Sequence, residues 1–60
     1  MTDAERLHTL RHDIANPLSA LLAEAQLLLL NDSKLDPEVA GSVREIEKLA
    51  LRMRALLRDI

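Results

Sequence analysis

Apolar residues recur at helical spacing along both halves of this chain, and this recurrence restricts the folds that the chain can adopt. In the first half, a leucine or isoleucine recurs every seven residues, and further apolar residues lie three or four positions from these. The set is Leu7, Leu10, Ile14, Leu18, Leu21, Ala25 and Leu28. Residues at this spacing share one face of a helix with about 3.6 residues per turn. The pattern therefore predicts one apolar stripe on an amphipathic helix.

The second half has the more regular pattern. Its apolar residues alternate three and four positions apart, as the core positions of coiled coils do. They are Val39, Val43, Ile46, Ala50, Met53, Leu57 and Ile60. Leu49 and Leu56 widen this face beyond what a single partner helix can cover. We therefore expect an all-α fold in which a helical hairpin dimerises into a four-helix bundle, with two-fold symmetry.

Residues that cap helices locate the ends of the two predicted elements. Thr2 and Glu5 fit a capping box, which satisfies free amides at a helix start. The stretch NDSKLDPE, residues 31–38, interrupts the apolar pattern with turn formers; Asp36 is the expected N-cap and Pro37 the first helical residue. Residues 1–60 thus form a single predicted domain, with helices over about 2–31 and 37–60 and a turn over about 32–36.

The composition supports helices and excludes several classes of protein. The 60 residues include no Phe, Tyr, Trp or Cys, so the core is aliphatic and neither disulfides nor thiolate metal sites are possible. A chain this short buries only about 60% of its unfolded surface, which favours self-association. A formal charge of −2 without a basic cluster argues against nucleic acid as a partner. With no signal peptide and no membrane-spanning apolar run, we expect a cytoplasmic segment without membrane contact.

The stretch LRHDIANPLSALL, residues 10–22, places a proline inside the first predicted helix, five residues after a histidine. His12 falls on the polar side, farthest from the predicted apolar stripe, so we expect it to be exposed. Pro17 cannot donate to the carbonyl of Asp13, and its ring crowds that carbonyl. We expect the helix to bend or loosen there, at a cost of about 3 kcal/mol relative to Ala. An exposed imidazole beside a carboxylate and a weakened helix favours a functional site.

The same residues resemble a known motif. RHDIANPLSAL is similar to the phosphoacceptor motif of the dimerisation and histidine-phosphotransfer domain of two-component sensor histidine kinases. That motif is a histidine, an acidic residue, two variable positions, Thr or Asn, and then Pro and Leu. The matching residues are His12, Asp13, Asn16, Pro17 and Leu18. The hairpin and its length also match, so the resemblance covers nearly the whole chain. The sequence departs from the family in having Arg11 where Ser is frequent, Ala15 where Arg or Lys is frequent, and no upstream aromatic residue.

The resemblance implies a role for each matching side chain. His12 would accept the γ-phosphoryl group of ATP and pass it to an aspartate of a response-regulator receiver domain. Asp13 would hydrogen-bond the imidazole and act as acid and base, while Asn16 would position water for dephosphorylation of the receiver. Pro17 would let the helix bend as upstream signals change. The chemistry is consistent with this, because imidazole titrates near neutral pH and an exposed ring can be approached in line.

A complete kinase also needs ATP-binding elements that this sequence lacks. There is one glycine and no glycine-rich phosphate loop, so we expect the chain to bind no cofactor. ATP and Mg²⁺ would be held by a separate catalytic domain, on the same or another chain. The chain is then either a small phosphotransfer protein or the central domain of a larger kinase, with the catalytic domain after Ile60 and a sensor or linker helix before Met1. In the second case, the parent protein can be anchored in a membrane.

A receiver domain must dock near His12 to take the phosphoryl group. Exposed residues farther along the first predicted helix, and the facing start of the second, are the expected contact surface. On the first helix these are Ser19, Ala23 and Gln26.

Three alternatives remain open from the sequence. His8 and His12 are four residues apart and could share one Zn²⁺ or Ni²⁺, but HTLRH lacks the glutamate of zinc proteases, and two ligands do not make a site. The chain could instead be a structural dimeric bundle, either a scaffold or an RNA-binding protein. The acidic balance opposes RNA, and a scaffold leaves the motif unexplained. A phosphatase-biased or inactive kinase relative fits the same residues.

Overall fold

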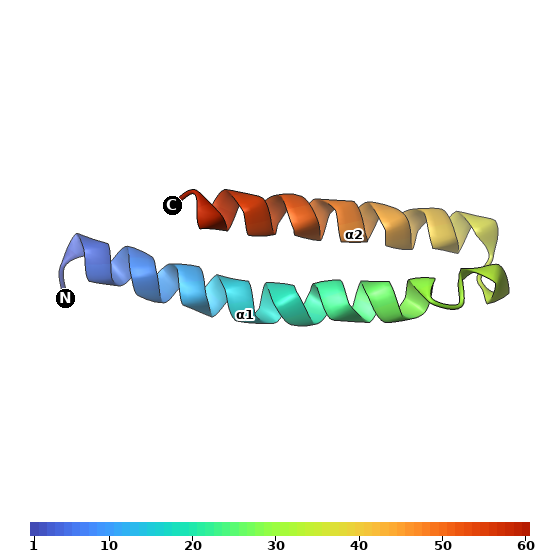
Figure 1. The fold of residues 1–60 in the computed structure, drawn as a ribbon, viewed down its shortest axis with the longest axis horizontal. Helices are drawn as coiled ribbons and strands as arrows, with labels where there is room; N and C mark the ends of the chain where they lie inside the picture. Colours follow the sequence, from blue (N-terminus) through green and yellow to red (C-terminus); the bar gives the residue numbers. More distant parts are fainter.

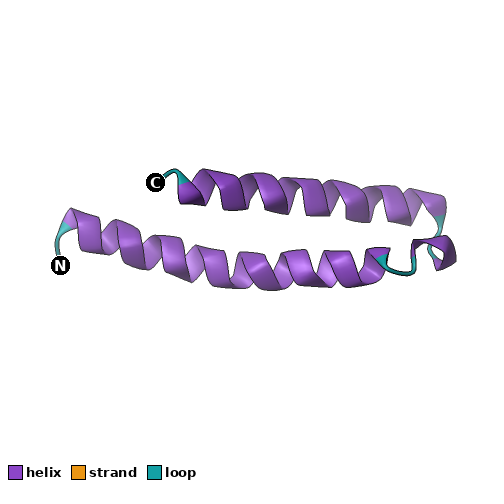
Figure 2. Ribbon diagram, viewed as in Figure 1, coloured by secondary structure: helices purple, strands orange, loops and turns teal.

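The computed structural model describes all 60 residues as two long antiparallel helices that form a rod of 49 × 15 × 12 Å (Figure 1). Helix α1 spans Asp3–Leu29 and helix α2 spans Pro37–Arg58. A short 3-10 helix, η1, at Asp32–Lys34 lies in the connection, and there are no strands (Figure 2). The predicted all-α hairpin is confirmed. Its helices end up to two residues inside the predicted ranges, and η1 was not indicated by the sequence pattern.

Side chains cap both helices at the residues that the sequence indicated. The Thr2 hydroxyl accepts a hydrogen bond from the Glu5 amide at 3.1 Å, and the Glu5 carboxylate accepts one from the Thr2 amide at 3.4 Å. At the start of α2, the Asp36 carboxylate accepts from the Glu38 amide at 2.9 Å, and Pro37 occupies the first turn. These bonds satisfy amides that would otherwise lack partners. The turn that reverses the chain is therefore specified by local residues.

The two helices meet along a seam of small and medium side chains. Its buried residues alternate three and four positions apart on each helix: Leu18, Leu22 and Ala25 on α1, and Ala40, Val43 and Ala50 on α2. Half-buried residues continue the same spacing: Arg11, Ala15 and Leu29 on α1, and Glu47 and Leu57 on α2. Three of the six buried residues are alanines, so the seam buries little apolar surface for its length.

A second apolar face lies beside the seam and is not covered. We call it the outer apolar face; it comprises Leu7, Leu10, Ile14, Leu21 and Leu28 of α1, Val39, Ile46, Leu49, Met53 and Leu56 of α2, and Ile60 just after α2. Residues from both helices line one shallow apolar depression on it, including Ile14, Met53 and Leu56. The outer apolar face therefore crosses the hairpin. Neither helix contains a stretch that is long and apolar enough to cross a membrane.

The expectation of a single apolar stripe on α1 was wrong. On α1, Leu18 and Ala25 are buried against α2, whereas Leu21 and Leu28 are each 51% exposed. The predicted stripe on α2 divides in the same way, with Val43 and Ala50 in the seam and the alternate residues exposed. The physical reason is that two neighbouring stripes on a helix share the same three-and-four spacing. Periodicity alone cannot tell them apart.

Pro17 lies inside α1 without ending it. The helix runs without interruption from Asp3 to Leu29 and is gently bowed in Figure 1. Because proline has no N–H, the carbonyl of Asp13 lacks the backbone donor that it would have in a regular helix. The loosening expected after His12 thus takes the form of one missing hydrogen bond.

Candidate functional site

His12 is exposed and lies at the edge of the seam. It follows Arg11, a half-buried seam residue, by one position. The predicted exposure of His12 is confirmed, although the residue lies closer to α2 than the sequence pattern indicated. The seam runs through Arg11 and Ala15, not through Leu7 and Ile14, so His12 borders α2.

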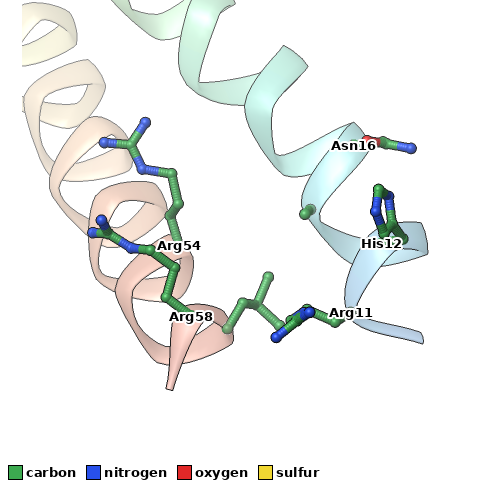
Figure 3. Close-up of a pocket in the computed structure, with 7 residues that line it drawn as sticks. Arg11, His12, Asn16, Arg54 and Arg58 are labelled. Atoms are coloured by element: carbon green, nitrogen blue, oxygen red, sulfur yellow. The ribbon is translucent and has the colours of Figure 1, made fainter. Parts of the chain in front are cut away.

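An open cleft of about 220 Å³ lies between the helices at this point (Figure 3). Its lining residues are Arg11, His12, Ala15 and Asn16 from α1, and Arg54, Leu57 and Arg58 from α2. His12 and Asn16 lie one turn apart on α1, so the structure brings these two predicted site residues together. The arginines of α2 were not identified from the sequence. They could have been found only from the register in which the two helices pair.

The imidazole of His12 makes no hydrogen bond with another residue. Its nearest aromatic neighbour is His8, with ring centroids 5.3 Å apart in an edge-to-face arrangement. Arg11 links this region to the end of α2: Nη1 donates to the Ile60 carbonyl at 3.1 Å, and Nη2 lies 3.4 Å from Nδ1 of His8. The structure has no group of three or more side chains that could hold a metal ion. The ring nitrogens of His12 are thus unoccupied by protein partners.

Comparison with models of protein families matches residues 4–60 to HisKA, the His Kinase A (phospho-acceptor) domain. The chain belongs to the HisKA family. This match covers both helices and the cleft, and it confirms the resemblance to the phosphoacceptor domain of sensor histidine kinases. No curated protein and no solved structure matches this HisKA domain.

The other predicted site residues lie on the surface of the HisKA domain. The Asp13 side chain is exposed, lies outside the cleft and makes no hydrogen bond to His12. The remaining exposed residues continue the line of His12 and Asn16 along α1 towards the turn: Ser19, Ala23 and Gln26. We call this line the polar stripe. Each residue of the polar stripe comes one position after a seam residue in the sequence, whereas residues of the outer apolar face come one position before seam residues. The two surfaces therefore flank the seam on opposite sides.

Proposed function

We propose that this HisKA domain is the phosphoacceptor and dimerisation domain of a sensor histidine kinase. His12 accepts a phosphoryl group from ATP bound on a separate catalytic domain and passes it to an aspartate of a response-regulator receiver domain. The observation that carries the proposal is the exposed, unpartnered imidazole at the edge of the cleft, in a chain that matches the phosphoacceptor family over residues 4–60.

The transfer needs a free imidazole nitrogen and a straight approach to it. The nitrogen attacks the γ-phosphorus of ATP as the bond from phosphorus to the ADP oxygen breaks, and ADP leaves with the electron pair. In the second step, the carboxylate of the receiver attacks the same phosphorus, and the imidazole leaves. Exposure of His12 allows both partners to reach it in turn.

We assign supporting roles to three neighbours of His12. Asp13 exchanges a proton with the imidazole and orients the ring, as carboxylates do for catalytic histidines. Asn16, which lines the same cleft, positions water for dephosphorylation of the receiver. Pro17 removes one hydrogen bond from α1 and so lowers the resistance of the helix to bending next to His12.

The proposal divides the partners among separate surfaces. A second copy of the chain covers the outer apolar face and completes a four-helix bundle. The receiver domain docks on the polar stripe, near Ser19, Ala23 and Gln26. ATP and Mg²⁺ belong to the catalytic domain, because this chain has a single glycine and no phosphate-binding loop. The isolated domain is therefore inactive as a kinase by itself.

Phosphorus NMR of the protein treated with phosphoramidate tests the proposal without an ATP site. The wild-type chain is compared with His12→Gln and His8→Gln. We expect an acid-labile phosphohistidine signal that is lost only in His12→Gln. Equal labelling of His8 and His12 would mean that exposure alone decides reactivity, and it would favour a structural scaffold.

A further inference from the structure

We propose that the cleft beside His12 is a phosphoryl-binding site in which the guanidinium groups of Arg54 and Arg58 hold the oxygens of the group that His12 receives. This inference rests on the proposed function for the identity of the transferred group. The binding itself is a property of the cleft and can be measured separately.

The charge of the cleft is opposite to that of the chain. The chain has a formal charge of −2, yet three of the seven residues that line the cleft are arginines and none is acidic. The one ion pair in the structure joins Arg44 to Asp32 near the turn, at the other end of the hairpin. The guanidinium groups of the cleft are therefore not neutralised by a carboxylate. An anion is the ligand that such a site fits.

The positions of these arginines are unusual for a helix pair. Arg11 and Arg54 continue the three-and-four spacing of the seam, at positions where apolar residues are normally buried. Ala15 lines the cleft between them and leaves space there. Apart from Glu47, the other seam residues are Leu, Val and Ala. The hairpin thus loses apolar contact at the level of His12, which packing alone does not favour.

Two of the three arginines are free to bind. Arg11 is engaged with the Ile60 carbonyl and with His8, whereas Arg54 and Arg58 have no side-chain hydrogen bond or ion pair. In Figure 3, their guanidinium groups extend across α2, away from α1 and His12. A phosphoryl group in the cleft would draw these long side chains across it. Each guanidinium can then donate two parallel hydrogen bonds to phosphoryl oxygens.

The site also fits a small donor that needs no second protein. With phosphoramidate, the lone-pair nitrogen of His12 bonds to phosphorus as the bond from phosphorus to ammonia breaks. Ammonia leaves with the electron pair, and the proton on the other ring nitrogen passes to the carboxylate of Asp13. Arg54 and Arg58 would balance the charge on the three remaining oxygens during this transfer.

The first test measures binding without any transfer. The side-chain NεH signals of the arginines are followed by NMR while inorganic phosphate is added. Arg52 is the control, because it is an exposed arginine of α2 that does not line the cleft. We expect saturable shifts for Arg54 and Arg58 that weaken as salt is added, and none for Arg52. Equal, unsaturable shifts of all three would overturn the site.

The second test measures the transfer. In Arg54→Gln and Arg58→Gln, the phosphoramidate concentration that gives half the maximal labelling rate should rise by about fivefold for each variant, as expected for one charge-assisted contact at an exposed site. Arg52→Gln should not change it, and Arg54→Lys and Arg58→Lys should recover part of the loss. Circular dichroism confirms that each variant keeps its helices.

The outcomes separate the two proposals. The double variant Arg54→Gln, Arg58→Gln decides the first proposal. If phosphoramidate labels it at the wild-type rate at every phosphoramidate concentration, the phosphoryl-binding site is overturned and His12 remains the acceptor. Phosphate binding at Arg54 and Arg58 without any labelling of His12 would overturn the proposed function and leave the binding site in place.

Discussion

The two histidines of α1 are both exposed and lie one turn apart, but their surroundings differ. His8 lies beside the guanidinium of Arg11, with 3.4 Å between Nη2 and Nδ1, and does not line the cleft. His12 lines the cleft and has no hydrogen-bond partner for its ring. If phosphotransfer selects His12 over His8, the neighbouring helix α2 is what distinguishes the two side chains. The difference between the surroundings of His8 and those of His12 cannot be inferred from their spacing in the sequence.

Asp13 should contribute to the reactivity of His12 although the two side chains are not hydrogen-bonded in the free chain. We expect Asp13→Asn to lower the rate of labelling by phosphoramidate about tenfold or more, because a carboxylate that accepts the imidazole proton is lost. The rate is measured from the growth of the phosphohistidine signal. A rate equal to that of the wild type would make Asp13 an ordinary solvated carboxylate.

Among the residues of α2, Gly41 has a low helix propensity and lowers the stability of the helix. A Cβ added there meets no atom within 4 Å, and the residue has no positive φ that would require glycine. We expect Gly41→Ala to raise the free energy of unfolding by about 1 kcal/mol per chain. Urea unfolding followed by circular dichroism measures this change. A loss of stability would show that assembly brings another surface against Gly41.

Pro17 should have a larger effect on α1. Replacing it by alanine restores the backbone hydrogen bond to the Asp13 carbonyl, and we expect a gain of about 2–3 kcal/mol per chain. The same urea experiment applies, with Gly41→Ala as the reference for an ordinary gain in helix propensity. If Pro17→Ala gains no more than Gly41→Ala, the bowed helix bears little strain at this residue.

The starts of both helices could be predicted from the sequence because their causes are local. The side chains of Thr2, Glu5 and Asp36 accept hydrogen bonds from amides within three residues of themselves. Pro37 occupies the first turn of α2, where its missing N–H needs no partner. The division of each apolar pattern into a seam and an outer face could not be predicted, since both follow the same spacing. The cleft could not be predicted from the sequence either. Arg54 and Arg58 lie near His12 only because of the register in which the two helices pair.

A single hairpin leaves most of its large apolar side chains exposed to solvent. Only six residues are buried, whereas eleven large apolar residues form the outer apolar face. Burying such a face is the dominant favourable term in association, so the stability of the fold should depend on a second copy. We expect the chain to be a dimer of twice its 6.7 kDa mass, and its melting temperature to rise with protein concentration.

Analytical ultracentrifugation of two charge-introducing variants checks this expectation. Leu49 and Leu27 are 49% and 57% exposed, but only Leu49 belongs to the outer apolar face. Leu49→Glu should abolish the dimer and most of the helicity, because it buries an unpaired charge. Leu27→Glu should leave both unchanged. A dimer that survives Leu49→Glu but not Leu27→Glu would place the interface on another side of α1.

The alanines of the seam have a mechanical consequence. A methyl group is too small to lock into the opposite helix, so Ala25, Ala40 and Ala50 offer little resistance when one helix slides along the other. Such sliding is resisted by the larger apolar residues of the seam, which are Leu18, Leu22, Leu29, Val43 and Leu57. The two helices can therefore shift slightly along their axes relative to each other. A small axial displacement of α1 would carry His12 past Arg54 and Arg58, the arginines of α2 that line the cleft.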